Sequence, residues 1–153
     1  MDPTSADRVV LPGERAKSIM AVEILLRMLR AASDNFPDDD LETVVIFLTV
    51  TAGSAGQAIR DPVSLRLVDN APLPDELFRP ISGRAVAASC GLPRETVRRR
   101  LDQLVAQGRM HRDERGFRVI SDTMSRGGNL AFGRGLIREL ETAAARLARL
   151  DAP

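Results

Sequence analysis

The sequence lacks tryptophan and tyrosine and has few of the residues that commonly carry chemistry. Its 153 residues include five phenylalanines, one cysteine (Cys90) and one histidine (His111). A single cysteine excludes an intramolecular disulfide and a cysteine-rich zinc site, and a single histidine excludes a two-histidine metal motif. The scattered phenylalanines are too few for a platform on which single-stranded nucleic acid could stack. We therefore expect no metal, no cofactor and no catalytic residues, and we do not expect an enzyme.

The chain also lacks a long apolar segment. Residues 43–59 carry no charge, but threonine, serine, glutamine and glycine interrupt them. The segment falls short of the roughly 20 mainly apolar residues that span a bilayer, so we expect a buried helix there. The first eight residues have no cationic start followed by an apolar core, so we expect no signal peptide. These patterns favour a cytoplasmic protein with no membrane partner.

Positive and negative charges nearly balance over the whole chain. Its 22 cationic residues, of which only Lys17 is a lysine, face 21 acidic ones, for a net charge of +1. That balance argues against a nucleic-acid binder, but the charges are unevenly distributed. Residues 79–118 contain ten arginines and four acidic residues, an excess of six, so the remainder of the chain carries −5. The segregation predicts a cationic face suited to phosphates, and arginine forks also match guanine edges.

Residues 82–108 have the pattern of two helices joined by a tight turn. Ser82 is a favoured N-cap for a helix over 83–89, and Gly91 can take the positive φ that a tight turn requires. A second helix is expected over 93–107, with Pro93 at its start and Gly108 after its end. Its apolar residues share one face, namely Val97, Leu101, Leu104 and Val105. The residues on or beside the outward face are Arg94, Glu95, Arg98, Arg99 and Asp102.

Two short strand-like runs follow directly, over 109–112 and 117–120. The four residues between them, Asp113 to Gly116, include a glycine and predict a β-hairpin. At this point the sequence resembles the winged helix-turn-helix bacterial transcriptional regulators, in the broad group that includes the MarR-like and GntR-like families. The resemblance covers about forty of the 153 residues. It is carried by Val86, Ala87, Cys90, Gly91, Leu92, Pro93, Glu95, Thr96, Val97, Arg98, Arg99, Leu101, Leu104, Gly108 and the wing over 112–117.

The resemblance implies a sequence-specific regulator that binds double-stranded DNA as a homodimer. The recognition helix over 93–107 would lie in the major groove, and the wing over 109–120 would lie on the backbone or in the minor groove. The residues expected to face DNA are Arg84, Arg94, Glu95, Thr96, Arg98, Arg99, Arg112 and Arg115. The alternative is a winged-helix adaptor that uses the same surface for an acidic protein partner.

Helices flanking this segment predict a mainly α fold with a small β-hairpin. A helix over 14–32 is apolar on most of its circumference except for the stripe of Glu23, Arg27 and Arg30, which suggests burial against a second subunit. A second helix is expected over 39–60 and a third over 136–150, with the glycine-rich residues 125–135 as a hinge. The third helix repeats Leu136, Leu140, Ala143, Leu147 and Leu150 as a packing seam, with Arg138, Glu139, Arg146 and Arg149 exposed. Three parts follow: dimerisation helices and a linker over 1–78, the winged helix-turn-helix over 79–122, and a dimerisation helix over 123–153.

Several single residues are assigned structural roles. Arg100 lies beside the core face of its helix, so we expect an ion pair or a covered stem rather than base reading. Cys90 is expected to be a small buried hydrophobe, and His111 a surface or phosphate-facing residue rather than a ligand. Adjacent acidic residues at 38–40 are expected to cap a helix rather than bind a metal. A small-molecule effector is compatible with the apolar helices, although no residue in the sequence marks its pocket.

Overall fold

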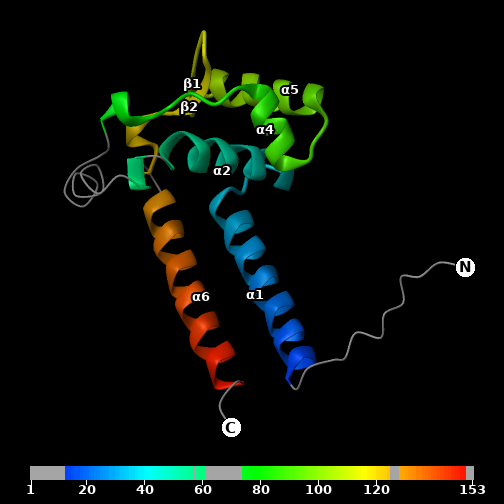
Figure 1. The fold of residues 1–153 in the computed structure, drawn as a ribbon. Coiled ribbons are helices and arrows are strands. Elements are labelled where there is room, and N and C mark those ends of the chain that lie inside the picture. Colours follow the sequence, from blue (N-terminus) through cyan, green and yellow to red (C-terminus); the bar gives the residue numbers. More distant parts are fainter. Residues whose placement is uncertain (1–12, 57, 61–73, 125–127, 151–153) are drawn as a thin grey trace, which may run out of the picture. The chain divides into compact units, whose positions relative to one another are not determined.

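A computed structural model describes residues 13–56, 58–60, 74–124 and 128–150 of the chain. Within these ranges the fold is mainly helical with one two-stranded antiparallel hairpin, as the sequence predicts (Figure 1). The predictions made for residues 1–8, 61–73 and 125–127 fall outside the described residues. In the described ranges, no helix has both the length and the apolar character needed to cross a bilayer. The helices and strands are α1 (Glu14–Asn35), α2 (Leu41–Ala55), α4 (Gly83–Cys90), α5 (Arg94–Ala106), α6 (Asn129–Arg149), β1 (Met110–Asp113) and β2 (Gly116–Val119), with 3₁₀ turns at Ala58–Arg60, Asp75–Leu77 and Ser121–Met124.

The chain divides into two compact units, one of which spans residues 35–130. In this unit α2 packs against α4, α5 and β2. The side chains with no exposed surface are apolar except for one serine, and they come from α2, α4 and α5: Ile46, Val50, Ser54, Val86, Val97, Leu101 and Leu104. Thus α2, which the sequence analysis groups with the N-terminal helices, contributes to the core beneath the helix-turn-helix.

An acidic cap starts α2, as the sequence predicts. The Oδ1 atom of Asp40 accepts hydrogen bonds from the backbone N–H of Thr43 at 2.9 Å and from its hydroxyl at 2.7 Å. The predicted end of this helix at residue 60 is wrong, because α2 ends at Ala55 and residues 58–60 form a 3₁₀ turn. Gly53 and Gly56 fall in and just after its last turn, and each glycine lowers helix propensity by about 1 kcal/mol relative to alanine.

The hairpin is joined by a third extended residue that the sequence does not reveal. Ile81, just before α4, exchanges two backbone hydrogen bonds with Phe117 of β2, at 2.8 and 2.9 Å. Gly116, with φ of 143°, lies so close that an added Cβ would sit 2.4 Å from the carbonyl oxygen of Ile81. The hairpin is therefore anchored to the residue that leads into the helix-turn-helix.

The second unit contains α1 up to Asp34 and α6 from Ala131 onward. The predicted start of α6 at residue 136 is wrong: the helix begins at Asn129, so Gly133 and Gly135 lie inside it and not in a hinge. The side-chain amide of Asn129 donates to the carbonyl oxygen of Thr123 at 2.8 Å, which fixes the chain at the helix start. Two glycines weaken a helix by roughly 2 kcal/mol but do not interrupt one of 21 residues.

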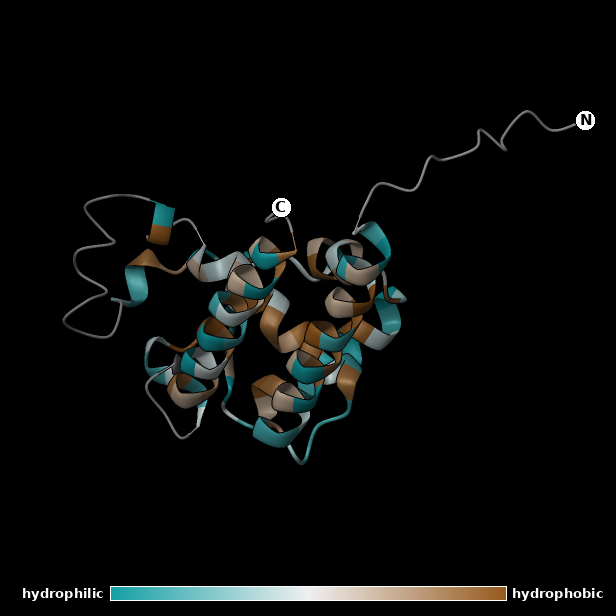
Figure 2. Cartoon of the chain, turned by 90° about the horizontal axis from the view of Figure 1, so that it is seen from below, coloured by the Kyte–Doolittle hydropathy of each residue, from teal (hydrophilic) through white to brown (hydrophobic). Residues whose placement is uncertain are grey.

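The two helices of this unit meet through charged residues. Arg27 of α1 pairs with Glu139 of α6 at 3.2 Å, and Glu23 pairs with Arg146 at 3.7 Å. The charged face predicted for α6 is exposed at Arg138 and Arg149, while Glu139 and Arg146 are half-buried by these pairs. The predicted packing seam is formed only in part, since Ala143 is buried and Leu140 is 57% exposed. Hydrophobic and hydrophilic residues alternate around the helices (Figure 2). The large apolar residues of this unit that remain exposed are Ile19, Val22, Leu25, Leu26, Ile137, Leu140 and Leu150.

Candidate nucleic-acid interface

The helix-turn-helix segment is held at both ends by the residues that the sequence singles out. The hydroxyl of Ser82 accepts a hydrogen bond from the backbone N–H of Ala85 at 3.2 Å and caps α4. Gly91 ends α4 in the left-handed conformation, with φ of 67°. Pro93 then stands at the N-cap position of α5, where its missing N–H leaves no helical hydrogen bond unmade. These local constraints set the direction in which α5 leaves the turn.

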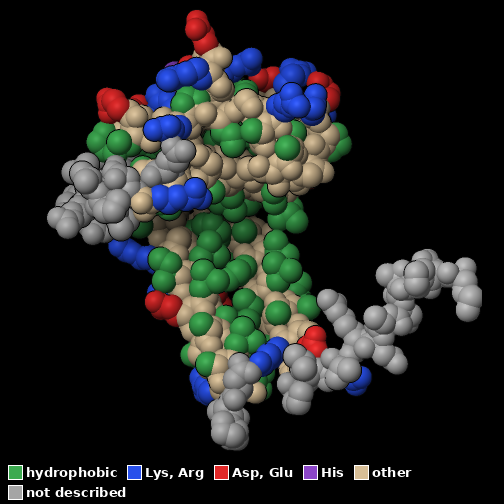
Figure 3. Space-filling model, in the orientation of Figure 1, with side chains coloured by type: hydrophobic (Ala, Val, Ile, Leu, Met, Phe, Trp, Pro, Cys, Tyr) green, Lys and Arg blue, Asp and Glu red, His purple; other side chains and the backbone are tan. Residues whose placement is uncertain are grey.

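The exposed side of α5 carries cationic side chains. Burial of Val97, Leu101 and Leu104 turns Arg94, Arg98 and Arg99 outward. Arg84, in the first turn of α4, is exposed as well, whereas Thr96 is half-buried. Arg84, Arg94 and Arg99 form no ion pair with any residue that the structure describes. In Figure 3 cationic side chains gather over α5 and the hairpin, with acidic side chains between them.

Arg98 is engaged by two acidic residues of its own helix. Its Nη2 and Nε atoms donate to the two carboxylate oxygens of Glu95 at 2.5 and 2.9 Å, and its Nη1 donates to Asp102 at 2.9 Å. Hydrogen bonds from Arg98 hold the pKa of the Glu95 carboxyl below its ordinary value and raise the pKa of Arg98. Of the arginines on the outer side of α5, Arg98 is therefore the one fixed in place.

The hairpin is connected to the same network. Arg112 of β1 donates to Asp102 at 3.2 Å, and its guanidinium lies 5.3 Å from the centre of the Phe117 ring. Arg115, at the turn, has a side chain that is 80% exposed and lies 3.8 Å from the Asp113 carboxylate. The turn itself is closed by Asp113, whose Oδ1 accepts from the backbone N–H groups of Arg115 and Gly116. Asp102 thus links α5 to β1, and Arg115 stands at the end of the hairpin.

A hollow of about 380 Å³ lies where α4, α5 and β1 converge. Leu101 and Phe117 contribute apolar atoms to its lining. The remaining lining residues are Gly83, Arg84, Arg94, Glu95, Arg98 and Arg112. Of the four guanidinium groups, those of Arg98 and Arg112 are paired with Glu95 and Asp102. Those of Arg84 and Arg94 have no acidic partner among the described residues, so the concavity keeps a positive charge suited to an anion such as a phosphate. Five of the eight residues that the sequence predicts to face DNA line this hollow, namely Arg84, Arg94, Glu95, Arg98 and Arg112. Arg99 on α5 and Arg115 at the hairpin turn are exposed but do not line it, and Thr96 is half-buried.

Three other arginines of residues 79–118 form ion pairs with acidic residues that precede this segment in the sequence. Arg100 pairs with Asp40, as its position beside the core face suggests, while Arg109 pairs with Asp39 at 2.6 Å. Arg118 pairs with Asp75 at 3.2 Å. The charge excess of six that the sequence gives this segment therefore falls to three on its outer surface. Sequence reasoning missed the second and third pairs, since no local pattern relates residues so far apart.

No protein-family model, curated protein or solved structure matches this chain. The assignment of a function rests on the residues and geometry described above. The resemblance to winged helix-turn-helix regulators stays a prediction from the motif over 86–117.

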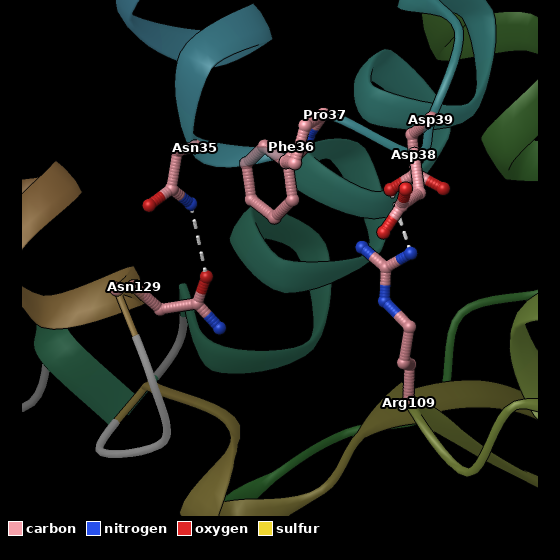
Figure 4. A pocket seen from close by; sticks show the side chains of 8 residues that line it. Asn35, Phe36, Pro37, Asp38, Asp39, Arg109 and Asn129 are labelled. Atoms are coloured by element: carbon pink, nitrogen blue, oxygen red, sulfur yellow. Dashed lines mark hydrogen bonds and ion pairs between the residues drawn. The ribbon is translucent and has the colours of Figure 1, made fainter.

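A second hollow, of about 340 Å³, lies near the start of α2 (Figure 4). Its lining includes Phe36, Asp39 and Arg109, and the Arg109 guanidinium lies 5.6 Å from the centre of the Phe36 ring and 4.7 Å from that of Phe47. At its other side the amide of Asn35 donates to Asn129 at 3.2 Å. Arg109 and Asp39 satisfy each other's charge within this hollow. The other carboxylate of the lining, Asp38, is exposed to solvent. One exposed carboxylate does not define a ligand site, so we assign this hollow no effector.

Cys90 and His111 take the positions expected of structural residues. Cys90 is half-buried rather than fully buried, because it ends α4 at the edge of the core, and its thiol donates to the hydroxyl of Thr49 at 3.2 Å. His111 is exposed on β1. Among the residues that the structure describes, no group of three histidine, cysteine or acidic side chains could hold a metal ion.

Proposed function

We propose that this protein is a sequence-specific transcriptional regulator that binds double-stranded DNA as a homodimer through a winged helix-turn-helix. The observation that carries the proposal is a continuous cationic surface. Arg84, Arg94 and Arg99 on α4 and α5 have no ion pair among the described residues, and they adjoin the exposed hairpin arginines, Arg112 and Arg115. A B-DNA major groove about 12 Å wide admits an α-helix, so the outward side of α5 would meet base edges there. Arg115 at the hairpin turn would then reach the neighbouring backbone or minor groove.

The exposed apolar residues of α1 and α6 support the homodimer. The charged residues of the two helices pair with each other, whereas Leu25 and Leu140 are 56% and 57% exposed in a single chain. Contiguous exposed apolar surface on a soluble protein marks an interaction site. A second copy that covers these faces would give the assembly two α5 helices, one for each half-site of a duplex, and such half-sites are about one helical turn, or 34 Å, apart. A bacterial regulator of this kind would act in the cytoplasm.

Binding of labelled duplexes at low salt tests the proposal. The variant carrying Arg94→Ala and Arg99→Ala is expected to bind at least tenfold more weakly and to lower the slope of log affinity against log salt by about two, as expected for two lost phosphate contacts. Its control carries Arg30→Ala and Arg138→Ala, which remove the same charge from exposed positions on α1 and α6. If the wild-type protein binds no duplex at low salt, the proposal fails. If affinity persists unchanged in the α5 variant but binding to an acidic protein partner is lost, the adaptor alternative is favoured.

A further inference from the structure

An acidic residue stands in the middle of the arginine-rich surface. Glu95 lies in the first turn of α5, and its side chain is 76% exposed. The positive end of the helix dipole favours a carboxylate there, but a dipole does not require the residue to face outward. An isolated carboxylate on a DNA-facing surface would be repelled by phosphates. The position of Glu95 therefore calls for a compensating interaction.

Arg98 supplies that compensation. The fork of its Nε and Nη2 atoms binds both oxygens of Glu95, and its third contact, to Asp102, keeps the guanidinium over the helix surface. The pair is electrically neutral, so it approaches a polyanion without net repulsion. The contacts also hold Glu95 in one position and keep it ionised, since Arg98 lowers the pKa of its carboxyl. An ionised carboxylate can accept hydrogen bonds and cannot donate them.

Each carboxylate oxygen of Glu95 retains a lone pair that Arg98 does not use. In the major groove the available donors are the N4 amine of cytosine and the N6 amine of adenine, whereas guanine and thymine offer acceptors at the matching positions. The adenine amine stands beside N7, whose lone pair repels a carboxylate. The cytosine amine stands beside a C–H group and brings no such repulsion. The chemistry thus favours cytosine over the other three bases.

We infer that Glu95 determines sequence specificity by accepting a hydrogen bond from the N4 amine of a cytosine in the major groove, with Arg98 as the residue that positions it. The inference rests on the proposed DNA-binding function. It leaves Arg94 and Arg99, which have no ion pair, as the α5 arginines free to contact phosphates or guanine.

Selection of bound sites from a random duplex pool tests the inference. The wild-type protein is expected to prefer cytosine roughly tenfold at one position of each half-site. Glu95→Gln is expected to shift that position to adenine, because a carboxamide pairs with both N6 and N7. Arg98→Lys keeps the charge but cannot form the fork, so the cytosine preference is expected to fall severalfold while the other positions stay unchanged. Glu114→Gln, at the exposed hairpin turn, removes the same charge as Glu95→Gln and is the control.

The outcomes separate the two proposals. If no sequence is enriched by the wild-type protein at low salt, sequence-specific DNA binding itself fails, and the role of Glu95 with it. If a site is enriched but lacks a preferred cytosine, or if Glu95→Gln selects the same site as the wild type, the role of Glu95 alone is overturned. Circular dichroism of each variant verifies that the exposed substitutions leave the helices intact.

Discussion

Asp40 connects two helices with one carboxylate, since its Oδ1 caps α2 through Thr43 and its Oδ2 pairs with Arg100 of α5. The same segment holds the chain just after α5, where Asp39 pairs with Arg109 and the guanidinium stacks over Phe47. Two ion pairs therefore hold the proposed recognition helix and the nearby Arg109 to the segment that leads into α2, in addition to the apolar face of the helix. Arg100 and Arg109 belong to the cationic segment by sequence, but their charges are used to hold the fold together.

Substitution of Asp40 separates its two contacts. Asp40→Asn keeps an oxygen that can cap α2 but loses the charge, so we expect the free energy of unfolding to fall by up to about 1 kcal/mol. Asp40→Ala also loses the cap, so its free energy of unfolding is expected to be about 1 kcal/mol lower still. Urea unfolding followed by circular dichroism measures both. Asp38→Asn, next to it and exposed, is the control and should change stability by less than about 0.5 kcal/mol. Equal losses for the asparagine and alanine variants would show that the cap contributes nothing.

Acid should weaken the fold partly through Asp40. Hydrogen bonds from Thr43, helped by the charge of Arg100, hold the pKa of its carboxyl below the ordinary 3.8. A pKa lowered in the folded state means that the unfolded chain binds the proton more readily, so this contribution is complete above 3.8 and is lost as the pH falls through the folded value. The stability difference between the wild type and Asp40→Asn should therefore stay constant from about pH 7 to pH 5 and shrink in more acidic solution. If the free energies of unfolding of the two proteins differ by the same amount at every pH, including acidic pH, the role given to the Asp40 carboxylate is contradicted.

Local signals in the sequence predict the two helices over 83–90 and 94–106, the turn between them and the hairpin. The structural effects of these signals extend over only a few neighbouring residues, as with the cap by Ser82, the turn at Gly91 and the hairpin turn at 113–116. They can therefore be recognised without knowledge of the tertiary structure. The pairs Arg100–Asp40 and Arg109–Asp39 join positions 60 and 70 residues apart, and no pattern marks the second of them. The bridge from Ile81 to Phe117 is hidden for the same reason.

Within the candidate site, the sequence predicts which side of α5 faces outward but not how its charges pair. Burial of Val97, Leu101 and Leu104 fixes that side through helical periodicity. The spacing of Glu95, Arg98 and Asp102 by three and four residues does allow the observed pairs, and this signal could have shown that Arg98 is engaged. In α1 and α6 each charged stripe alone resembles a solvated surface, because only the fold brings Arg27 to Glu139.

Gly116 is expected to be irreplaceable in the hairpin. Gly116→Ala would place a Cβ 2.4 Å from the Ile81 carbonyl oxygen at a φ of 143°, so we expect a loss of about 2 kcal/mol or more in the free energy of unfolding. Gly108→Ala is the matched control, since Gly108 has a φ of 68° but no atom within 4 Å of an added Cβ. The free energy of unfolding of Gly108→Ala should fall by only about 1 kcal/mol, because alanine is disfavoured at this positive φ. Similar losses in urea unfolding of the two variants would show that contact with Ile81 does not matter.

The oligomeric state tests the exposed apolar faces of α1 and α6. The wild-type protein is expected to scatter light with twice the mass of its 16.7 kDa chain. Leu25→Glu combined with Leu140→Glu should give a particle of one chain mass, because two charges would have to be buried at the interface without partners. Both side chains are more than half exposed in the single chain, so helix content should stay high.

Ile59→Glu provides the control for the charge itself. Ile59 is 52% exposed, comparable to Leu25 and Leu140, but it belongs to the unit that spans residues 35–130. If the faces of α1 and α6 form the interface, Ile59→Glu stays dimeric while the double variant does not. A wild-type protein of one chain mass, or a double variant that remains a dimer, would remove the support that these faces give to the homodimer. DNA binding through α5 would then have to be explained with a single recognition helix per duplex site.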